Sequence, residues 1–548
     1  MFGFKSFSSR AVHTYSNSEK VQGMTVLISS IRFKVVVACF ILIGAFTGIS
    51  CSQSPALEQE ARTAETAGKS SGSVAVQEGE VWQVIYVNNQ RIGYAYSQTR
   101  VDDRGENKLI HNQSDSYLKL KRFGQTLNME THLSTTENKQ GDLLSYTFQM
   151  NNPPADSTIS EGKVKDSLLI VETKIANQVS RSQLKWEATF HSPSYLEQMF
   201  KVSPMQPGET KSFSMLLPEY SKVSKVSLTA LDYETAELHG GVEEKCLHVK
   251  MKQELLPGMV VDLYVTKEGT IPKTAADFLG SAMVTYIVSK EVALKELSGG
   301  ELDLAVQTLI KVKPIPHAHD TEKVVYQLTL DDGDPTEFLK NGDTQQVKKR
   351  DARSVELTVV KAAVPTQFPK AKVDAEYVGP TQFIQSDDAR VMKYAAAAVQ
   401  SEQNPWKQAT LMERYVHQNL KKKNFSTALA SAAEVAKNME GDCTEHAVLL
   451  AAMLRAQNLP SRVAVGLVYI PSRSSFGGHM WTEVFLDNRW IPLDATLGKG
   501  GIGAGHIKLA DSSLSDNAPA PLAIFLPILQ AVGKLSIEVI DSGSKTAR

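Results

Sequence analysis

The stretch GDCTEHA at residues 441–447 stands at the head of a long alanine- and leucine-rich segment, and it decides how the chain is interpreted. Two further blocks follow it, GGHMWTEV at 477–484 and WIPLDAT at 490–496. A cysteine, a histidine and an aspartate therefore occur in that order, each in a setting that suits a catalytic triad of thiol, imidazole and carboxylate. This region is the predicted working part of the protein.

Cys443 is the candidate nucleophile. Gly441 or Asp442 is expected to cap a helix that begins at or near Cys443 and continues through Leu454. A thiol at a helix start lies at the positive end of the helix dipole and close to backbone N–H groups, which both favour the thiolate. The same N–H groups can hold a tetrahedral oxyanion. Taken alone, Cys443 fits equally well as a small core residue, which is a common state of cysteine.

His479 and Asp494 are the candidate base and its orienting partner. The strand pattern from His479 puts every second residue on one face, and Asp487-Asn488 predicts a turn before the next strand. A two-residue loop there sets Asp494 opposite Trp481, on the same face as His479. A register shifted by two places Asp494 directly opposite His479, whereas a three-residue loop points it away unless a bulge intervenes. A lone histidine in a strand is more often a core or surface residue, so the prediction of a catalytic site depends on Cys443, His479 and Asp494 occurring together.

The three blocks together resemble those of the transglutaminase-like superfamily of bacterial proteins. Between them, Arg455, Leu459-Pro460-Ser461-Arg462 and Gly466 match the family's intervening segment. Asn458 replaces a usual glycine, and Ala495 replaces the usual proline of Asp-Pro-Thr. The similarity covers about 380–500, less than a quarter of the chain.

The resemblance implies a papain-like α+β core without a cofactor. It carries over Cys443 as nucleophile, His479 as general base and acid, and Asp494 as orienter. The implied reaction is attack on a carboxamide, release of ammonia or an amine, and transfer of the acyl group to an amine or to water. His446 is expected to support the site rather than to react, and the glycine-rich loop at 498–503 is expected to be a mobile lid near its mouth.

The rest of the chain is predicted to be tether and β-rich scaffold. Residues 52–80 are poor in large apolar side chains and are expected to be a disordered tether. Short alternating segments joined by turns, such as Asn88-Asn89, predict a β-rich domain over 81–300. A small β module with linkers is expected over 301–372, and the catalytic domain over 373–548. The fold class is therefore α+β, with the papain-like core at the C-terminal end.

Residues 1–51 predict an export signal. The apolar run at 35–49 follows Arg32 and Lys34 and is shorter than the roughly 20 residues of a membrane-spanning helix. Gly48-Ile49-Ser50-Cys51 is similar to a bacterial lipobox, in which Cys51 would be lipidated, although Gly48 stands where an aliphatic residue is usual. Cleavage without lipid, or retention of the run as an anchor, is the alternative. Met24 is a second candidate for the start of translation. The predicted location is the cell envelope, with a lipid anchor in a membrane.

Composition excludes several other functions. The net charge of −1 gives no electrostatic attraction to nucleic acid. Two of the four cysteines lie in the export region, so Cys246 and Cys443 do not form a disulfide framework, and Cys246 is expected to be a buried thiol in a strand. His317 and His319 lack a third ligand nearby in the sequence, and no acidic calcium loop is evident, so no metal is predicted.

Two functions remain from the sequence. The first is a transglutaminase-like thiol enzyme that acts on protein or peptide carboxamides of the cell envelope, as an acyltransferase or as a protease or amidase. The second is a non-enzymatic surface lipoprotein in which the β-rich half binds a partner and the catalytic fold is only architecture. The presence of all three candidate residues favours the enzyme.

Overall fold

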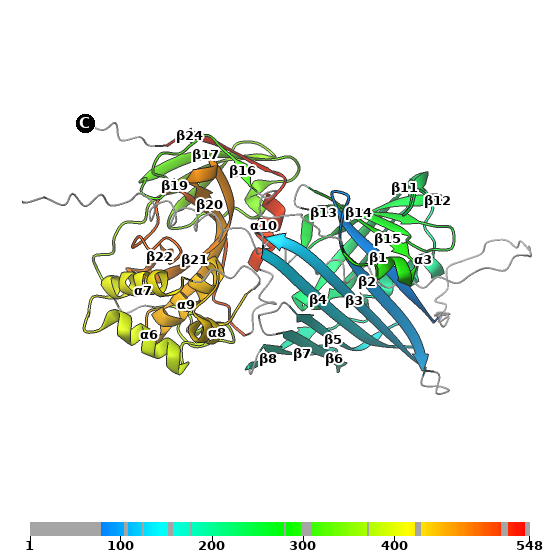
Figure 1. Ribbon diagram of the computed structural model, residues 1–548, viewed down its shortest axis with the longest axis horizontal. Helices are drawn as coiled ribbons and strands as arrows, with labels where there is room; N and C mark the ends of the chain where they lie inside the picture. The colour runs from blue at the N-terminus through cyan, green and yellow to red at the C-terminus, as the bar shows by residue number, and fades with distance from the viewer. Residues whose placement is uncertain are drawn as a thin grey trace, which may run out of the picture.

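The computed structural model describes residues 78–102, 108–122, 125–151, 157–175, 178–278, 281–297, 309–369, 372–421, 429–516 and 524–542. The predicted signal, Cys51 and residues 52–77 of the predicted tether lie outside these residues, whereas Gly79 and Glu80 at the predicted tether's end already belong to the first strand of the sheet. The described chain forms two parts, a large curved β-sheet and a smaller α+β part that contains Cys443, His479 and Asp494 (Figure 1). The predicted α+β class is confirmed.

The β-rich part is a single sheet of 15 strands among the described residues. The strand order is β8-β7-β6-β5-β4-β3-β2-β1-β15-β14-β13-β12-β11-β10-β9. The strands are β1 (Gly79–Val87), β2 (Gln90–Asp102), β3 (Leu109–Arg122), β4 (Gln125–Asn138), β5 (Leu143–Asn151), β6 (Thr158–Lys165), β7 (Leu168–Ile175), β8 (Gln178–Lys185), β9 (Phe190–His191), β10 (Thr210–Leu217), β11 (Lys222–Glu237), β12 (Glu243–Gln253), β13 (Leu256–Val265), β14 (Lys273–Phe278) and β15 (Ser281–Val288). Its short helices are α3 (Tyr195–Val202), η2 (Pro218–Tyr220) and α4 (Lys290–Ala293).

Local sequence explains this antiparallel arrangement. Asn88 and Asn89 have φ of 48° and 63°, which is the left-handed backbone of a two-residue hairpin turn whose twist matches that of the strands. Strand β11 alternates buried and exposed side chains over much of its length, so one face of the sheet covers the core. Cys246 lies on β12 and is fully buried, as expected, and burial raises the pKa of its thiol to about 11.

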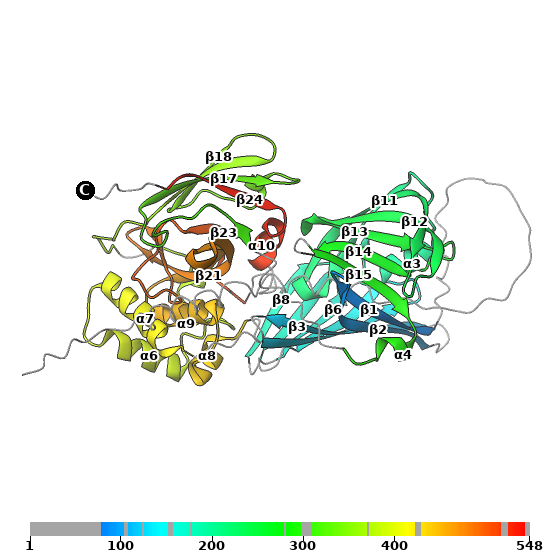
Figure 2. The same cartoon turned by 45° about the horizontal axis from the view of Figure 1, so that its top comes forward.

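The α+β part contains two sheets and a group of helices (Figure 2). The catalytic sheet has the order β16-β21-β20-β23, with β22 also paired to β21, and the small sheet has the order β18-β19-β17-β24. The strands are β16 (Ile310–Lys311), β17 (Lys323–Leu330), β18 (Gln345–Lys349), β19 (Ser354–Val360), β20 (Ser461–Ile470), β21 (Ser475–Leu486), β22 (Arg489–Leu493), β23 (His506–Ser512) and β24 (Leu535–Asp541). The helices are η3 (Pro335–Glu337), η4 (Ala375–Tyr377), α6 (Ala389–Val399), α7 (Pro405–Asn419), α8 (Ala432–Asn438), α9 (Cys443–Ala456), η5 (Pro471–Arg473) and α10 (Leu526–Ala531).

The strands of the predicted small module at 301–372 do not form a sheet of their own, because they pair with strands from elsewhere in the chain. Its strands β17, β18 and β19 form one sheet with the C-terminal strand β24, while β16 pairs with β21 of the catalytic sheet. The described segment around β16 therefore lies along the catalytic sheet. The sheet to which each of these strands belongs depends on pairing between residues far apart in the sequence, so the local pattern does not predict it.

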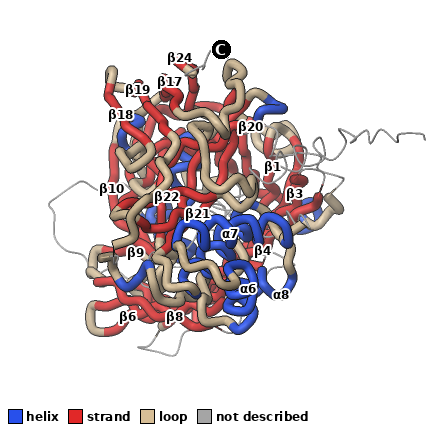
Figure 3. Tube along the Cα trace, turned by 90° about the vertical axis from the view of Figure 1, so that its left-hand side faces the viewer, coloured by secondary structure: helices blue, strands red, loops and turns tan. Residues whose placement is uncertain are grey.

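Helices α6, α7 and α8 gather around α9 (Figure 3). Helix α9 packs on β20 and β21, and α6, α7 and α8 pack around α9. Asp388 caps α6 and Asn404 caps α7 with side-chain hydrogen bonds, which fixes where these helices begin. Gln382 joins the two parts, because its Nε2 donates to Thr173 O at 3.3 Å and its Oε1 accepts from Ser180 Oγ at 3.1 Å. Among the described residues no helix is long and apolar enough to span a membrane.

Candidate active site

Helix α9 begins at Cys443 because a capping box surrounds that residue. The Asp442 side chain accepts the N–H groups of Thr444, at 2.9 Å, and of Glu445, and Glu445 Oε2 accepts the Asp442 N–H at 2.9 Å. The prediction that the helix starts at Cys443 is therefore confirmed. The N–H groups of Thr444 and Glu445 are already bonded to Asp442, so they are not available to an oxyanion as the sequence suggested.

Gly441 is required by this arrangement. Its φ is +145°, and a Cβ at this position would lie 2.3 Å from both Cβ and Cγ of Glu445. A side chain here would displace the carboxylate that completes the cap. Glu445 is also tied to the chain before α8, because its Oε1 accepts the Ala430 N–H at 3.1 Å. Gly441 thus leaves room for the capping box at the N-terminus of α9, where Cys443 lies.

Helix α9 packs against strand β21, and two hydrogen bonds fix how the helix lies along the sheet. Thr482 Oγ1 donates to Ala447 O at 2.9 Å, and Ser461 Oγ, opposite Val484 in the sheet, donates to Ala451 O at 2.8 Å. Four helical residues, about 6 Å of rise, thus span nearly the same length as two strand residues, about 6.6 Å. Cys443 lies one turn before Ala447, at the start of α9. Cys443 there is 3% exposed.

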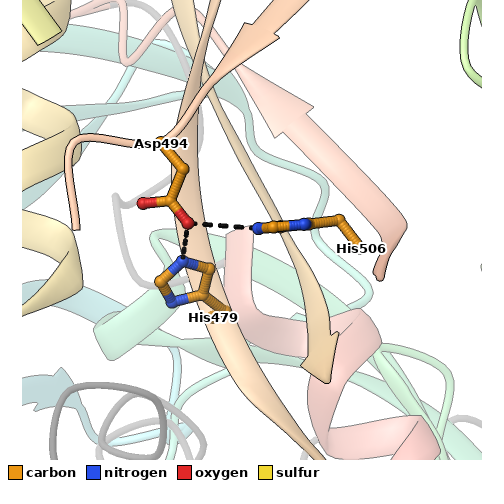
Figure 4. A group of neighbouring side chains, drawn as sticks. All are labelled: His479, Asp494 and His506. Carbon is orange, nitrogen blue, oxygen red and sulfur yellow. Dashed lines mark hydrogen bonds and ion pairs between the residues drawn. The ribbon is translucent and has the colours of Figure 1, made fainter. Parts of the chain in front are cut away.

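His479 and Asp494 meet as the predicted register requires. Asp487 and Asn488 form a two-residue turn with φ of 56° and 57°, and β22 then pairs with β21 so that Leu493 lies opposite Thr482. The next residue, Asp494, accepts a hydrogen bond from His479 Nε2 through Oδ2 at 2.8 Å (Figure 4). The predicted two-residue turn and shared face are confirmed.

Two residues that the sequence did not single out complete the surroundings of Asp494. His506 Nε2 lies 3.1 Å from Asp494 Oδ2, the same oxygen that His479 contacts. Glu413 of α7 accepts the Asp494 N–H through Oε1 at 3.0 Å and the Gly500 N–H through Oε2 at 2.7 Å. Glu413 thereby ties the glycine-rich loop, expected to be a mobile lid, to α7.

The carboxylates of Asp494 and Glu413 are fully buried and differ in charge. Burial alone would raise the pKa of Asp494, but the positive charge that His479 carries when protonated, and the hydrogen bonds from His479 and His506, outweigh it and hold that pKa well below its ordinary value. Burial, and then the negative charge of Asp494, raise the pKa of Glu413 to about 8, although three backbone N–H groups oppose the shift. Asp494 is therefore ionised at neutral pH, while Glu413 is largely protonated.

An ionised carboxylate determines the tautomers of the histidines. Because the Asp494 carboxylate can only accept, the Nε2 atoms of His479 and His506 both carry hydrogen. In the neutral ring of His479 the lone pair is then on Nδ1. That atom is buried and has no hydrogen-bond partner among the described residues. This is the arrangement that a histidine needs to accept a proton from a thiol.

The donor atoms of His479, Asp494 and His506 lie within 4.8 Å of one another, so we tested them as a metal centre. Two imidazoles and a carboxylate are a common set of zinc ligands. Metal-bound histidines, however, normally donate their other ring N–H to an acceptor. In the described structure Nδ1 of His479 and Nδ1 of His506 have no such partner. The three residues therefore fit a hydrogen-bonded cluster better than a metal centre.

Arg455 and Asn458 belong to the segment that links α9 to β20. Arg455 is buried and donates to the carbonyls of Gly379, Ser461 and Ser513 at 2.8, 2.9 and 2.9 Å, which links α9 to the strand that follows. Burial lowers its pKa to about 10. Asn458, at the position where glycine was expected, has φ of 59°, a left-handed backbone that asparagine tolerates.

Comparison with known families places a transglutaminase-like domain in this region. Residues 392–495 match the family described as the transglutaminase-like superfamily. The matched range contains Cys443, His479 and Asp494 and ends one residue after the aspartate. His506 and β23 lie beyond it. Comparison with curated proteins finds no match.

Three solved structures show a distant likeness. A candidate cysteine protease from Cytophaga hutchinsonii has 16% identity, with 39% of this chain and 83% of that chain covered and a TM-score of 0.26. A β-barrel-like protein from Brucella abortus, a domain of unknown function, has 9% identity, 38% and 95% coverage and a TM-score of 0.29. A candidate protease from Parabacteroides distasonis has 10% identity, 64% coverage of each chain and a TM-score of 0.18. At these TM-scores the likeness carries no argument about function.

Proposed function

We propose that the protein is a cysteine acyltransferase or hydrolase of the transglutaminase-like type that acts on carboxamides of proteins or peptides. The observation that carries the proposal is the bond of 2.8 Å between His479 Nε2 and Asp494, which leaves Nδ1 as the proton acceptor of a buried base. Cys443 supports it by its place at the capped start of α9, one turn before the contact of that helix with β21. The match to the transglutaminase-like superfamily over the same residues supports the class of chemistry.

The proposed reaction has two stages. The Cys443 thiol gives its proton to His479 Nδ1, and the sulfur attacks the carboxamide carbon to form a tetrahedral intermediate. His479 returns the proton to the leaving nitrogen, the C–N bond breaks, and ammonia or an amine departs from a thioester on Cys443. An amine or water then loses a proton to His479 and attacks the thioester. The C–S bond breaks, and the proton on His479 returns to the thiol. Asp494 holds the imidazole and stabilises its positive charge throughout.

The proposed setting is the cell envelope. It rests on the sequence alone, through the apolar run at 35–49 and the lipobox-like Cys51. The substrates are accordingly proposed to be envelope proteins or peptides, and the chain to be held at a membrane through lipid on Cys51. Mass spectrometry of the mature N-terminal peptide tests the anchor, because a lipidated Cys51 carries the added mass of the acyl groups. An unmodified peptide that extends upstream of Cys51 would refute it.

Thiol labelling tests the enzyme without knowledge of the substrate. The full chain is treated with limiting iodoacetamide at several pH values, and labelled peptides are quantified by mass spectrometry. Cys443 is expected to react at least tenfold faster than Cys246 at pH 7, because the Cys246 thiol has a pKa of about 11 and stays protonated. His479→Ala should slow the labelling of Cys443, and Cys246→Ala should leave Cys443 unchanged.

The reaction itself is tested by comparing the natural protein with Cys443→Ala. Both are incubated with envelope proteins, with and without a primary-amine probe. Loss of new cleavage, deamidation or amine incorporation in the variant is the expected result. The enzyme proposal fails if Cys443 reacts no faster than Cys246 and the variant matches the natural protein in every product.

A further inference from the structure

The hydrogen-bonded cluster holds one histidine more than a catalytic triad needs. His506 is the first residue of β23, lies opposite Val468 of β20, and is 3% exposed. Its ring packs edge-on against Trp481, with centroids 5.3 Å apart, and against His319, with centroids 5.6 Å apart. A buried polar ring needs a partner for its N–H, and Asp494 provides it at 3.1 Å. Figure 4 shows both histidines directed at one oxygen of Asp494.

We propose that His506 is a positioning residue of the candidate triad, which holds the Asp494 carboxylate so that His479 keeps its proton on Nε2 and its lone pair on Nδ1. This inference rests on the proposed function and adds to it a fourth residue, contributed by a strand outside the matched family range.

Three donors hold the Asp494 carboxylate. Oδ2 receives Nε2–H groups from His479 at 2.8 Å and His506 at 3.1 Å, and Oδ1 receives the Thr496 N–H at 2.8 Å. Without His506, the oxygen that contacts His479 has that one partner, and rotation of the carboxylate is less restricted. A carboxylate that turns away permits the other His479 tautomer, in which Nδ1 carries the proton and cannot accept one from a thiol.

A neutral histidine suits this role better than a permanent cation. A lysine or arginine beside Asp494 would neutralise the charge that stabilises protonated His479. Burial lowers the pKa of His506, so its ring donates a hydrogen bond without adding a charge. The other titratable groups that face Asp494 are His479 on β21, Glu413 on α7 and His319 in the segment before β17.

The test compares three variants in the full chain. His506→Phe keeps the ring and its packing but removes the donor. His506→Gln places an amide N–H near the position of Nε2 and is the conservative rescue. His319→Phe is the matched control, because this neighbouring ring is also buried but no hydrogen bond joins it to Asp494 among the described residues. Circular dichroism and thermal unfolding confirm that each variant is folded.

The first readout is the pH dependence of Cys443 alkylation by iodoacetamide. Loss of one hydrogen bond to an ionised group should move the acid limb of the profile up by about one pH unit in His506→Phe, a tenfold loss of thiolate on that limb. His506→Gln and His319→Phe should stay near the natural protein. The inference is overturned if His506→Phe superimposes on the natural profile, or if His506→Gln is as impaired as His506→Phe.

The second readout does not depend on the thiol. In chains labelled with ¹⁵N-histidine, the ring nitrogens of His479 report its tautomer directly. The natural protein should show the proton on Nε2, and His506→Phe should show a mixture with the Nδ1 tautomer. If Cys443 is not activated in the natural protein, the proposed function fails, while this spectrum still decides the role of His506.

The third readout addresses a metal at the same residues. The natural protein and His506→Phe are titrated with Zn²⁺ by calorimetry and with Co²⁺ by visible absorption. No stoichiometric binding that depends on His506 is expected, because neither Nδ1 atom has an acceptor. One equivalent of tetrahedral Co²⁺, lost in His506→Phe, would show that the cluster is a metal site and would overturn the positioning role.

Discussion

Glu413 should make the stability of the catalytic part fall as pH rises toward 8. Its carboxyl is fully buried beside Asp494, and burial followed by the charge of Asp494 raises its pKa from 4.5 to about 8. The folded state therefore favours the protonated form more strongly than the unfolded chain does. The stabilisation is complete below pH 4.5 and is lost progressively as pH rises to 8.

The expected magnitude follows from the size of this shift. Each pH unit between the two pKa values costs about 1.4 kcal/mol, so folding should weaken by about 3 kcal/mol between pH 5 and 7.5. Glu413→Gln keeps the shape of the side chain but cannot titrate, so it lacks this slope. Its amide also faces the N–H groups of Gly500 and Asp494, which costs a constant amount at every pH.

The assay is urea unfolding of both proteins at pH 5, 6, 7 and 7.5, followed by tryptophan fluorescence. Burial lowers the pKa of His319 to about 3 and also lowers that of His506, so both histidines oppose folding when acid charges them. Both histidines are present in the natural protein and in Glu413→Gln. The difference between the two unfolding free energies at each pH therefore reports the titration of Glu413 alone. A difference that is the same at pH 5 and 7.5 would refute the reasoning and show that Glu413 is ionised throughout.

Four further substitutions, at three positions, test the local structure. Gly441→Ala should displace Glu445, lower the free energy of unfolding by about 2 kcal/mol in urea and slow the alkylation of Cys443. Unchanged values would contradict the requirement for a glycine at this positive φ. Asn458→Gly should leave the unfolding free energy within about 0.5 kcal/mol, whereas Asn458→Val should lower it by about 1–2 kcal/mol, because a β-branched residue resists a left-handed backbone. Arg455→Met should lower it by about 3 kcal/mol, because buried carbonyls lose their donors, and a smaller loss than in Asn458→Val would contradict this.

Much of the candidate site could be predicted because its elements are local. The capping box at Asp442 and the turn at Asp487-Asn488 each need only a few adjacent residues, so their sequence signals are strong. Once the turn is known, the alternation of strand residues places Asp494 on the face of His479. The predicted roles of Cys51 and of the segment before residue 78 lie outside the described residues and stay predictions.

Of the residues around Asp494 that the sequence analysis did not single out, only Glu413 occupies a position whose pattern could have indicated it. It lies among the buried positions of α7, between Ala409, Met412 and Val416, where a glutamate needs a partner. His506 had no comparable signal, because it follows a glycine-rich loop at the start of a short strand. Its contact with Asp494 exists because β23 joins the sheet beside β20, whereas β22 joins on the other side through β21.

The sequence by itself determined the parts of this protein that depend on neighbouring residues: the start of α9 at Cys443, the hairpin that carries His479 toward Asp494, and the α+β class. The tertiary structure decided which distant groups surround the carboxylate and which of them are charged. His506, Glu413 and His319 reach Asp494 from three separate elements, and burial sets the protonation of all three. Burial and sheet order arise only when the whole chain packs, so no short stretch of sequence encodes them.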